Sequence, residues 1–166
     1  MPVPNASFVA PEARRRTSFA RVDVASTPCT LQIARERLDD KQLVLAVSEK
    51  TLLPVVIAAA PYAEIAPRLR VGIADVLRAL RISREDIDAE CAAMTEVVYG
   101  KTTNRQVLGI LVDFAKALRF YLRPGSTLLE ISLSLAETPC SPLFKTTVSP
   151  DRTTVKLFTC DRERGA

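Results

Sequence analysis

The spacing of apolar residues divides much of the chain into segments that we expect to be strands and helices. Two apolar runs, residues 43–47 and 52–58, flank a polar four-residue connection, which predicts a β-hairpin buried on at least one face. Over residues 62–80, apolar side chains recur at steps of three and four, which predicts an amphipathic helix. Ser83, followed by acidic residues in the first turn, predicts another helix that ends near Met94.

A short alternating segment, residues 95–99, predicts a strand that is closed by Gly100. A long amphipathic helix is predicted to begin at Thr103 or Asn104 and to reach about Leu122, before a Pro-Gly pair. These two elements follow one another closely, so the sequence places a strand and a turn directly before the long helix.

Three segments carry weaker signals. Thr27-Pro28 has the composition of an N-cap and first-turn proline, so we expect a helix from there to about Leu38. Residues 126–136 match both the helical and the alternating period, and the cleaner alternation predicts a strand. Ser149-Pro150 predicts the start of a last short helix.

The resulting order, β-β-α-α-β-α-β-α with a hairpin, predicts an α+β fold in which helices pack on a small, mainly antiparallel sheet. The length of 166 residues fits one domain with a continuous core. Residues 1–21 contain three prolines, a run of arginines and no apolar period. We therefore predict a flexible basic tail over residues 1–21 and a single globular domain over residues 22–166.

Most of the net charge of +4 lies in that tail, where four arginines oppose one glutamate. The rest of the chain is close to neutral, so its charge alone predicts no strong binding to phosphates. Nucleic-acid binding is therefore expected only through the tail, with Arg14, Arg15 and Arg16 as the candidate residues. Such a run of arginines is more often a solvated terminus than a binding arm.

Composition excludes several chemistries. The chain has no histidine, and its four cysteines are far apart in sequence, so we predict no metal site and no cofactor. Phosphate-loop, dinucleotide and nucleophile-elbow motifs are absent, and Cys140 lacks a histidine base for nucleophilic catalysis. No apolar run approaches the roughly 18 residues of a membrane span, and the first residues do not resemble a secretory signal. We expect a cytoplasmic protein with no membrane contact.

The long helix carries the most informative polar residues. On a helical wheel Arg105, Gly109 and Asp113 lie opposite the apolar face, and Lys101 and Asn104 lie at the helix start, where free N–H groups favour anions. In a structural reading, Asn104 caps the helix, Arg105 and Asp113 pair with loop groups and Gly109 allows close packing. In a functional reading, these five residues bind a ligand. Arg105 and Asp113 are two turns apart, too far for a strong ion pair, so each needs another partner.

These residues also carry a resemblance. The segment K-T-T-N-R-Q-V-L-G-I-L-V-D-F-A, residues 101–115, resembles the signature of an uncharacterised bacterial domain-of-unknown-function family with the motif K-T-x-N-R-x-V-L-G-x-x-x-D-F. The likeness covers residues 25–160 and includes the downstream E-T-P-C segment, residues 137–140. Ile110 and Val112 depart from the family pattern, which tends to have Ser and Asn there. The resemblance implies that the chain is related to this family, and it implies no particular activity.

Three functions remain open. We expect a non-catalytic interaction or regulatory domain with a protein partner, and a link to bacterial mobile elements or defence is a hypothesis for its setting. The first alternative is a small ligand-binding domain or an enzyme that uses the polar edge of the helix starting near Asn104, with Asp113 or a glutamate as acid or base. The second alternative is nucleic-acid binding through the arginine tail.

Overall fold

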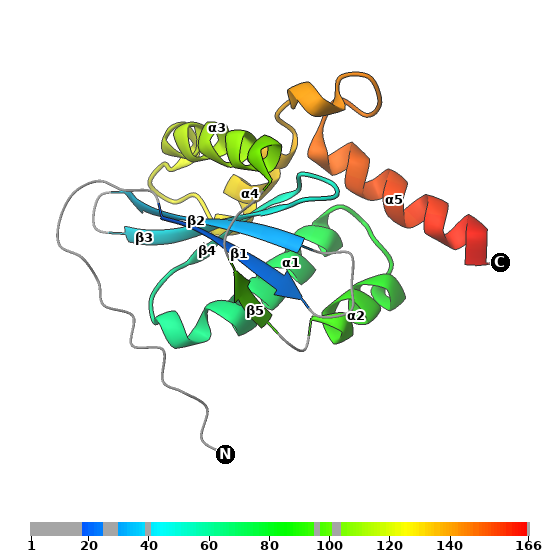
Figure 1. Cartoon of the computed structure of the whole chain (residues 1–166), viewed down its shortest axis with the longest axis horizontal. Coiled ribbons are helices and arrows are strands. Elements are labelled where there is room, and N and C mark those ends of the chain that lie inside the picture. Colours follow the sequence, from blue (N-terminus) through cyan, green and yellow to red (C-terminus); the bar gives the residue numbers. More distant parts are fainter. Residues whose placement is uncertain (1–17, 25–29, 39–40, 95–96, 101–103, 166) are drawn as a thin grey trace, which may run out of the picture.

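The described residues of the computed structural model, 18–24, 30–38, 41–94, 97–100 and 104–165, form a five-stranded antiparallel sheet with helices on both faces (Figure 1). This arrangement confirms the predicted α+β class. The strand order is β4-β3-β2-β1-β5. The strands are β1 (Ser18–Val24), β2 (Thr30–Leu38), β3 (Lys41–Ser48), β4 (Pro54–Ala58) and β5 (Val97–Gly100). The helices are α1 (Ile65–Ala79), α2 (Arg84–Ala93), α3 (Arg105–Tyr121), α4 (Leu128–Ala136) and α5 (Pro150–Gly165).

Strand β3 is buried on both faces. Leu43, Leu45 and Val47 pack in one apolar cluster with α3 and α4, whereas Val44 and Ala46 pack in a second cluster with α1. Because side chains alternate across a strand, a continuous apolar run is the pattern expected when both faces are covered. The predicted hairpin of β3 and β4 is confirmed, and its register pairs Leu45 with Val56.

Helix α1 approaches the sheet closely at Gly72. A Cβ built on Gly72 would lie 2.9 Å from Ile57 Cγ2 and 3.1 Å from Val55 Cγ1, both on β4. Such distances are below ordinary van der Waals contact, so the absence of a side chain at this position allows the helix to pack at its observed distance. The same helix places Leu69, Ile73 and Val76 in the core beside β4.

Helix α4 covers the outer edge of β4. The hydroxyl of Ser132, which is buried, accepts a hydrogen bond of 2.9 Å from the backbone N–H of Val56 and donates one of 2.7 Å to the carbonyl of Leu128. An edge strand otherwise leaves such N–H groups without a partner. Ile131 of α4 belongs to the cluster that packs with α3, and Ala136 belongs to the cluster that packs with α1. The helix therefore contacts the cores on both sides of the sheet.

The helix predicted over residues 27–38 is wrong, because Thr30–Leu38 forms strand β2. This strand pairs with β1 on one side and with β3 on the other. Pairing on both edges is a tertiary effect that overrides the local signal of Thr27-Pro28. Thr27 and Pro28 themselves lie outside the described residues.

The strand predicted over residues 126–136 is also wrong. Helix α4 begins there with a complete capping box, in which the Thr127 hydroxyl accepts from the Glu130 N–H and the Glu130 carboxylate accepts from the Thr127 N–H. This T-x-x-E pattern satisfies two backbone groups at the helix start and favours a helix over the alternating reading of the same residues. The predicted starts of α2 at Ser83 and α3 at Asn104 are confirmed by their N-cap hydrogen bonds.

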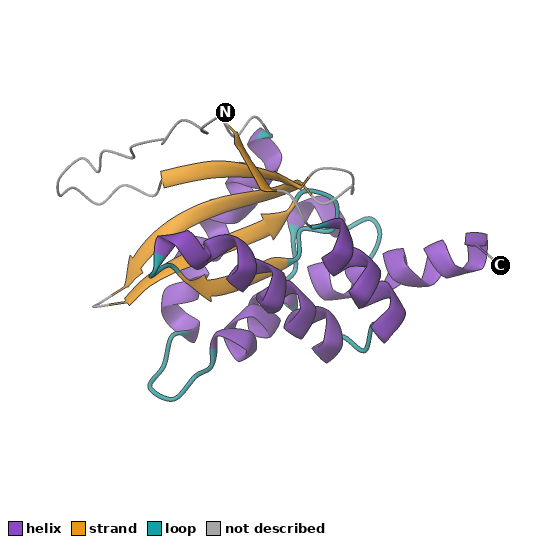
Figure 2. Cartoon of the chain, turned by 90° about the horizontal axis from the view of Figure 1, so that it is seen from below, coloured by secondary structure: helices purple, strands orange, loops and turns teal. Residues whose placement is uncertain are grey.

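The two ends of the chain also differ from expectation. Strand β1 begins at Ser18, so the last four residues of the predicted tail over residues 1–21 belong to the sheet, and residues 1–17 lie outside the described part. The last helix, α5, has 16 residues and is not short. It packs through Thr154 and Phe158, and its far end extends away from the rest of the molecule (Figure 2).

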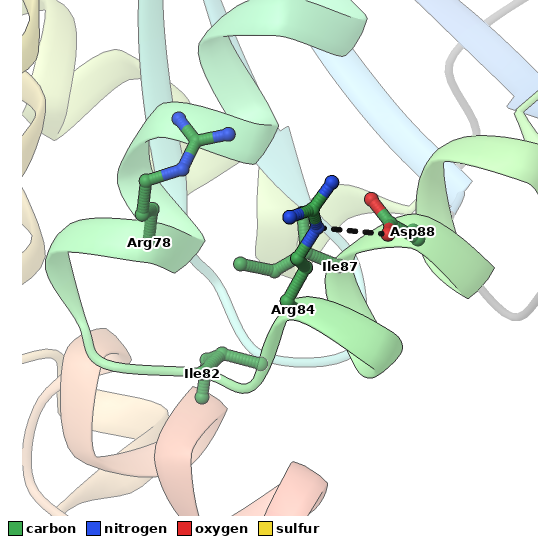
Figure 3. A pocket seen from close by; sticks show the side chains of 5 residues that line it. All are labelled: Arg78, Ile82, Arg84, Ile87 and Asp88. Carbon is green, nitrogen blue, oxygen red and sulfur yellow. Dashed lines mark ion pairs between the residues drawn. The ribbon is translucent and has the colours of Figure 1, made fainter.

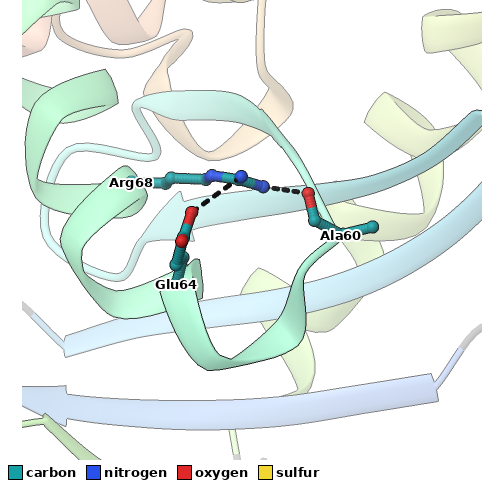
Figure 4. Close-up of polar contacts among 3 residues, drawn as sticks. All are labelled: Ala60, Glu64 and Arg68. Carbon is teal, nitrogen blue, oxygen red and sulfur yellow. Dashed lines mark hydrogen bonds and ion pairs between the residues drawn. The ribbon is translucent and has the colours of Figure 1, made fainter.

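The connection from β4 into α1 is held by Arg68. Its guanidinium donates to the carbonyl of Ala60 and forms an ion pair of 2.8 Å with Glu64 (Figure 4). The side chain of Arg68 is 32% exposed and that of Glu64 is 56% exposed, so solvent screens the pair and it contributes only a fraction of a kcal/mol to stability.

We expect Ser132→Ala to lower the free energy of unfolding by about 1–2 kcal/mol, because the buried N–H of Val56 loses its acceptor. Chemical denaturation monitored by circular dichroism measures the change. Ser134→Ala is the matched control: its hydroxyl bonds only to the Glu130 carbonyl of its own helix, so the change should be within about 0.5 kcal/mol. Equal losses in the two variants would contradict the proposed role of Ser132.

Two helix glycines should respond in opposite ways to alanine. Gly72→Ala should destabilise the fold by about 1 kcal/mol, because crowding against Ile57 and Val55 exceeds the gain in helix propensity. Gly109→Ala should stabilise it by about 0.5–1 kcal/mol, because an added Cβ meets no atom within 4 Å. Unfolding in dilute solution measures both, and a gain at Gly72 would show that α1 can move outward without cost.

Candidate functional site

Helix α3 begins with an N-cap supplied by Asn104. The side-chain oxygen of Asn104 accepts hydrogen bonds from the backbone N–H groups of Gln106, at 3.1 Å, and Val107, at 3.3 Å. These bonds satisfy two of the donors that a ligand would otherwise use at this helix start. Asn104 is therefore engaged in the helix itself, and Lys101, the other residue predicted at this position, lies outside the described residues.

The opposite faces of α3 divide as the helical wheel predicts. Val107, Leu111, Phe114 and Leu118 are buried against the sheet. Arg105, Gly109 and Asp113 are exposed on the side that points away from the sheet, and α3 forms the outer layer there (Figure 1). Tyr121, which the wheel also assigns to the core face, is exposed at the helix end.

The charged side chains on this exposed side of α3 make few contacts with the other described residues. Asp113 lies 3.7 Å from Lys116, and both side chains are more than 70% exposed, at 72% and 73%. Arg105 forms no ion pair or side-chain hydrogen bond with any described residue. The loop partners that the structural reading required for Arg105 and Asp113 are thus absent from the described part of the chain.

Gly109 lies between these two charges and is open to solvent. A Cβ at Gly109 would meet no heavy atom within 4 Å, so no close packing inside the domain requires a glycine. The part of the structural reading in which Gly109 allows close packing therefore has no support among the described residues, whereas the part in which Asn104 caps the helix is confirmed. Glycine in a helix interior costs about 1 kcal/mol relative to alanine, and no contact with the described residues compensates for this cost.

Phe120 lies on the same side of α3 and was not selected by the sequence analysis. Its side chain is 76% exposed, the largest exposed fraction among the large apolar side chains of the described residues. At 100° per residue Phe120 falls within about 20° of Gly109, roughly 16 Å further along the helix. The wheel alone could have found it, because an aromatic residue on a polar side of a helix is unusual. We call Arg105, Gly109, Asp113, Lys116 and Phe120 the outer stripe of α3.

Cys140 lies beneath α3 and is not available as a nucleophile. Its side chain is buried in the cluster that contains Val107 and Leu111. Burial, with a smaller effect from the carboxylate of Asp113, raises the pKa of the Cys140 thiol to about 11. At neutral pH the thiol is therefore protonated, whereas nucleophilic cysteines require a lowered pKa. The E-T-P-C segment thus packs against the helix that carries the other resembling segment.

A depression of about 480 Å³ lies between α1 and α2 (Figure 3). It is lined by Arg78, Ile82, Arg84, Ile87 and Asp88. Both arginines are already paired with acids of their own helices, Arg78 with Asp75 at 2.6 Å and Arg84 with Asp88 at 3.6 Å. These pairs weaken the attraction for an anion, and none of the predicted ligand-binding residues lines the depression.

The remaining predicted features concern the tail, metals and membranes. Arg14, Arg15 and Arg16 lie outside the described residues. Within the part of the chain that the structure describes, no three histidine, cysteine or acidic side chains gather where they could hold a metal ion. No helix formed by the described residues is long and apolar enough to cross a membrane.

Comparison with known families places the chain among its relatives. A family model described as a domain of unknown function, DUF6933, matches residues 34–153. The chain belongs to the DUF6933 family. No curated protein and no solved structure matches it.

The matched DUF6933 region holds the outer stripe of α3 but not the whole sheet. It includes β3, β4, α1, α2, β5, α3 and α4, together with part of β2 and the first turn of α5. Strand β1 lies outside it, although β1 is paired between β2 and β5. Both segments that carry the sequence resemblance, around Arg105 and around Cys140, lie inside the DUF6933 region.

We expect Arg105→Ala and Asp113→Ala each to change the free energy of unfolding by no more than about 0.5 kcal/mol, because both side chains are exposed. Leu111→Ala on the same helix is the control, and its buried side chain should cost about 2–5 kcal/mol. Thermal and denaturant unfolding of the four proteins measure these values. A loss above 2 kcal/mol in either charged variant would show that the residue stabilises the fold.

Proposed function

We propose that this chain is a non-catalytic interaction domain that binds a protein partner through the outer stripe of α3. The observation that carries the proposal is the 76% exposed Phe120 on the same side of one helix as the open Gly109. Exposed aromatic side chains are frequent anchors in protein interfaces, and a glycine lets a second backbone approach closely.

The chemistry around α3 supports binding over catalysis. Cys140 is buried with a raised pKa, so it does not resemble a nucleophile, and Asp113 is highly exposed and does not line the depression between α1 and α2. The sequence has no histidine to take that role. A surface of mixed charge with one aromatic anchor is the composition expected of the rim and centre of a protein interface.

The stability of α3 supports the same conclusion. Its core face alone fixes it to the sheet, so the outer stripe is free to be selected for contact with another molecule. Gly109 lowers helix stability and makes no close packing contact with the described residues in return, and such a residue is expected where function requires it. A link to bacterial mobile elements or defence would set the identity of the partner and does not change the surface proposed.

A photo-crosslinking amino acid at position 116 of the full chain tests the proposal in cells that naturally make the protein. We expect a discrete adduct that disappears in Phe120→Ser. The matched control is Val71→Ser, which removes an exposed apolar side chain from α1 on the other face of the sheet and should leave the adduct unchanged. A crosslinker at position 71 should give no discrete adduct. An adduct that survives Phe120→Ser, or no adduct at position 116, would refute the proposal.

A further inference from the structure

Two charged residues of the outer stripe, Arg105 and Asp113, lie symmetrically about Gly109. Arg105 precedes Gly109 by four residues and Asp113 follows it by four, so each lies about 6 Å from it along the helix axis. The two side chains also leave the helix at about 40° on either side of the Gly109 direction. A positive and a negative group are thus placed at equal distances from an open backbone position.

A two-fold axis beside Gly109 would bring these charges together. If a second copy of α3 packs antiparallel to the first with the two Gly109 residues facing, Arg105 of each copy lies at the same height as Asp113 of the other. Two oppositely charged pairs then form from one pair of residues. Arg105 has no partner among the described residues, and Asp113 has only the exposed contact with Lys116, so both are available.

The packing geometry of helices allows this contact. Arg105, Gly109 and Asp113 form one row of residues four apart, and two such rows lie parallel in the commonest class of helix crossing. Neighbouring helix axes are 8–10 Å apart in general, and facing glycines favour the shorter distance. An added Cβ at Gly109 meets nothing within 4 Å, so no side chain of the described residues blocks the approach at this position.

We propose that the partner bound by the outer stripe of α3 is a second copy of this chain, related by a two-fold axis at Gly109. This inference rests on the proposed function, because it assigns an occupant to the same surface. The occupant is argued from charge complementarity: the row of Arg105, Gly109 and Asp113 is complementary to itself when it is reversed. A contact through one helix from each copy is small, so we expect weak association with a dissociation constant on the order of micromolar.

Sedimentation equilibrium of the purified full chain over a range of concentrations tests the dimer. We expect the mass to rise toward twice that of one chain, and to fall again as salt is increased. Gly109→Gln should remain folded and should weaken association by about tenfold or more, because a side chain then separates the two helices.

Charge reversal gives the sharper test. Arg105→Asp and Asp113→Arg should each weaken self-association by about tenfold or more, because each places like charges opposite one another twice. An equimolar mixture of these two variants should associate again, since every acidic position then faces a basic one. The matched controls are two single variants on α2, Arg84→Asp and Asp88→Arg. Arg84 and Asp88 are also exposed and lie four residues apart on their helix. Neither control should change the mass.

The outcomes separate this inference from the proposed function. A chain that stays monomeric, or a dimer unaffected by the Arg105 and Asp113 variants, overturns the second copy as the occupant. If the crosslinker at position 116 then captures a different protein, the interaction function stands and only the identity of the partner changes. If position 116 captures nothing and the chain is monomeric, both proposals fail.

Discussion

The edge of strand β4 is closed by a helix, and the hydrogen bond from the Val56 N–H to the Ser132 hydroxyl is the contact on which this closure depends. The same serine bonds to Leu128 in its own helix, so the position of α4 is fixed against the sheet edge. Helix α4 supplies residues to the clusters on both faces. It also leads directly into the turn at Cys140, which packs under α3. The contacts of α4 with the sheet edge, and of the turn at Cys140 with α3, therefore help to fix the orientation of the outer stripe.

The sequence predicted elements well where the signal is local and strong. The hairpin, α1, α2 and α3 have clear periodicity or a recognisable cap, and the structure contains each of them. Strand β2 could not be found this way, because its identity depends on pairing with β1 and β3 at distant positions. The prediction for residues 128–136 is wrong for another reason: the Thr127–Glu130 capping box is a more specific signal than the alternating pattern of the same residues.

The sequence predicts which side of α3 is exposed, but it does not predict how the residues on that side pack. Helical geometry placed Arg105, Gly109 and Asp113 on one side, and the structure has them exposed there. What the glycines do could not be predicted, because Gly72 and Gly109 have similar sequence contexts, and only the element that packs opposite distinguishes them. Gly72 faces β4 and Gly109 faces solvent. Helical geometry also places Phe120 on this side of α3, but only the structure shows that its side chain is exposed.

The position of β1 has a consequence for where the folding unit ends. The DUF6933 match begins at residue 34, inside β2, yet β5 reaches the sheet only by pairing with β1, which lies at residues 18–24. A chain trimmed to the matched residues would lose the neighbour of β5 and leave the backbone of β2 with an unpaired edge. Such edges recruit other strands, so the shortened protein would be prone to aggregation. The segment that matches the DUF6933 family is therefore shorter than the segment that forms the complete sheet.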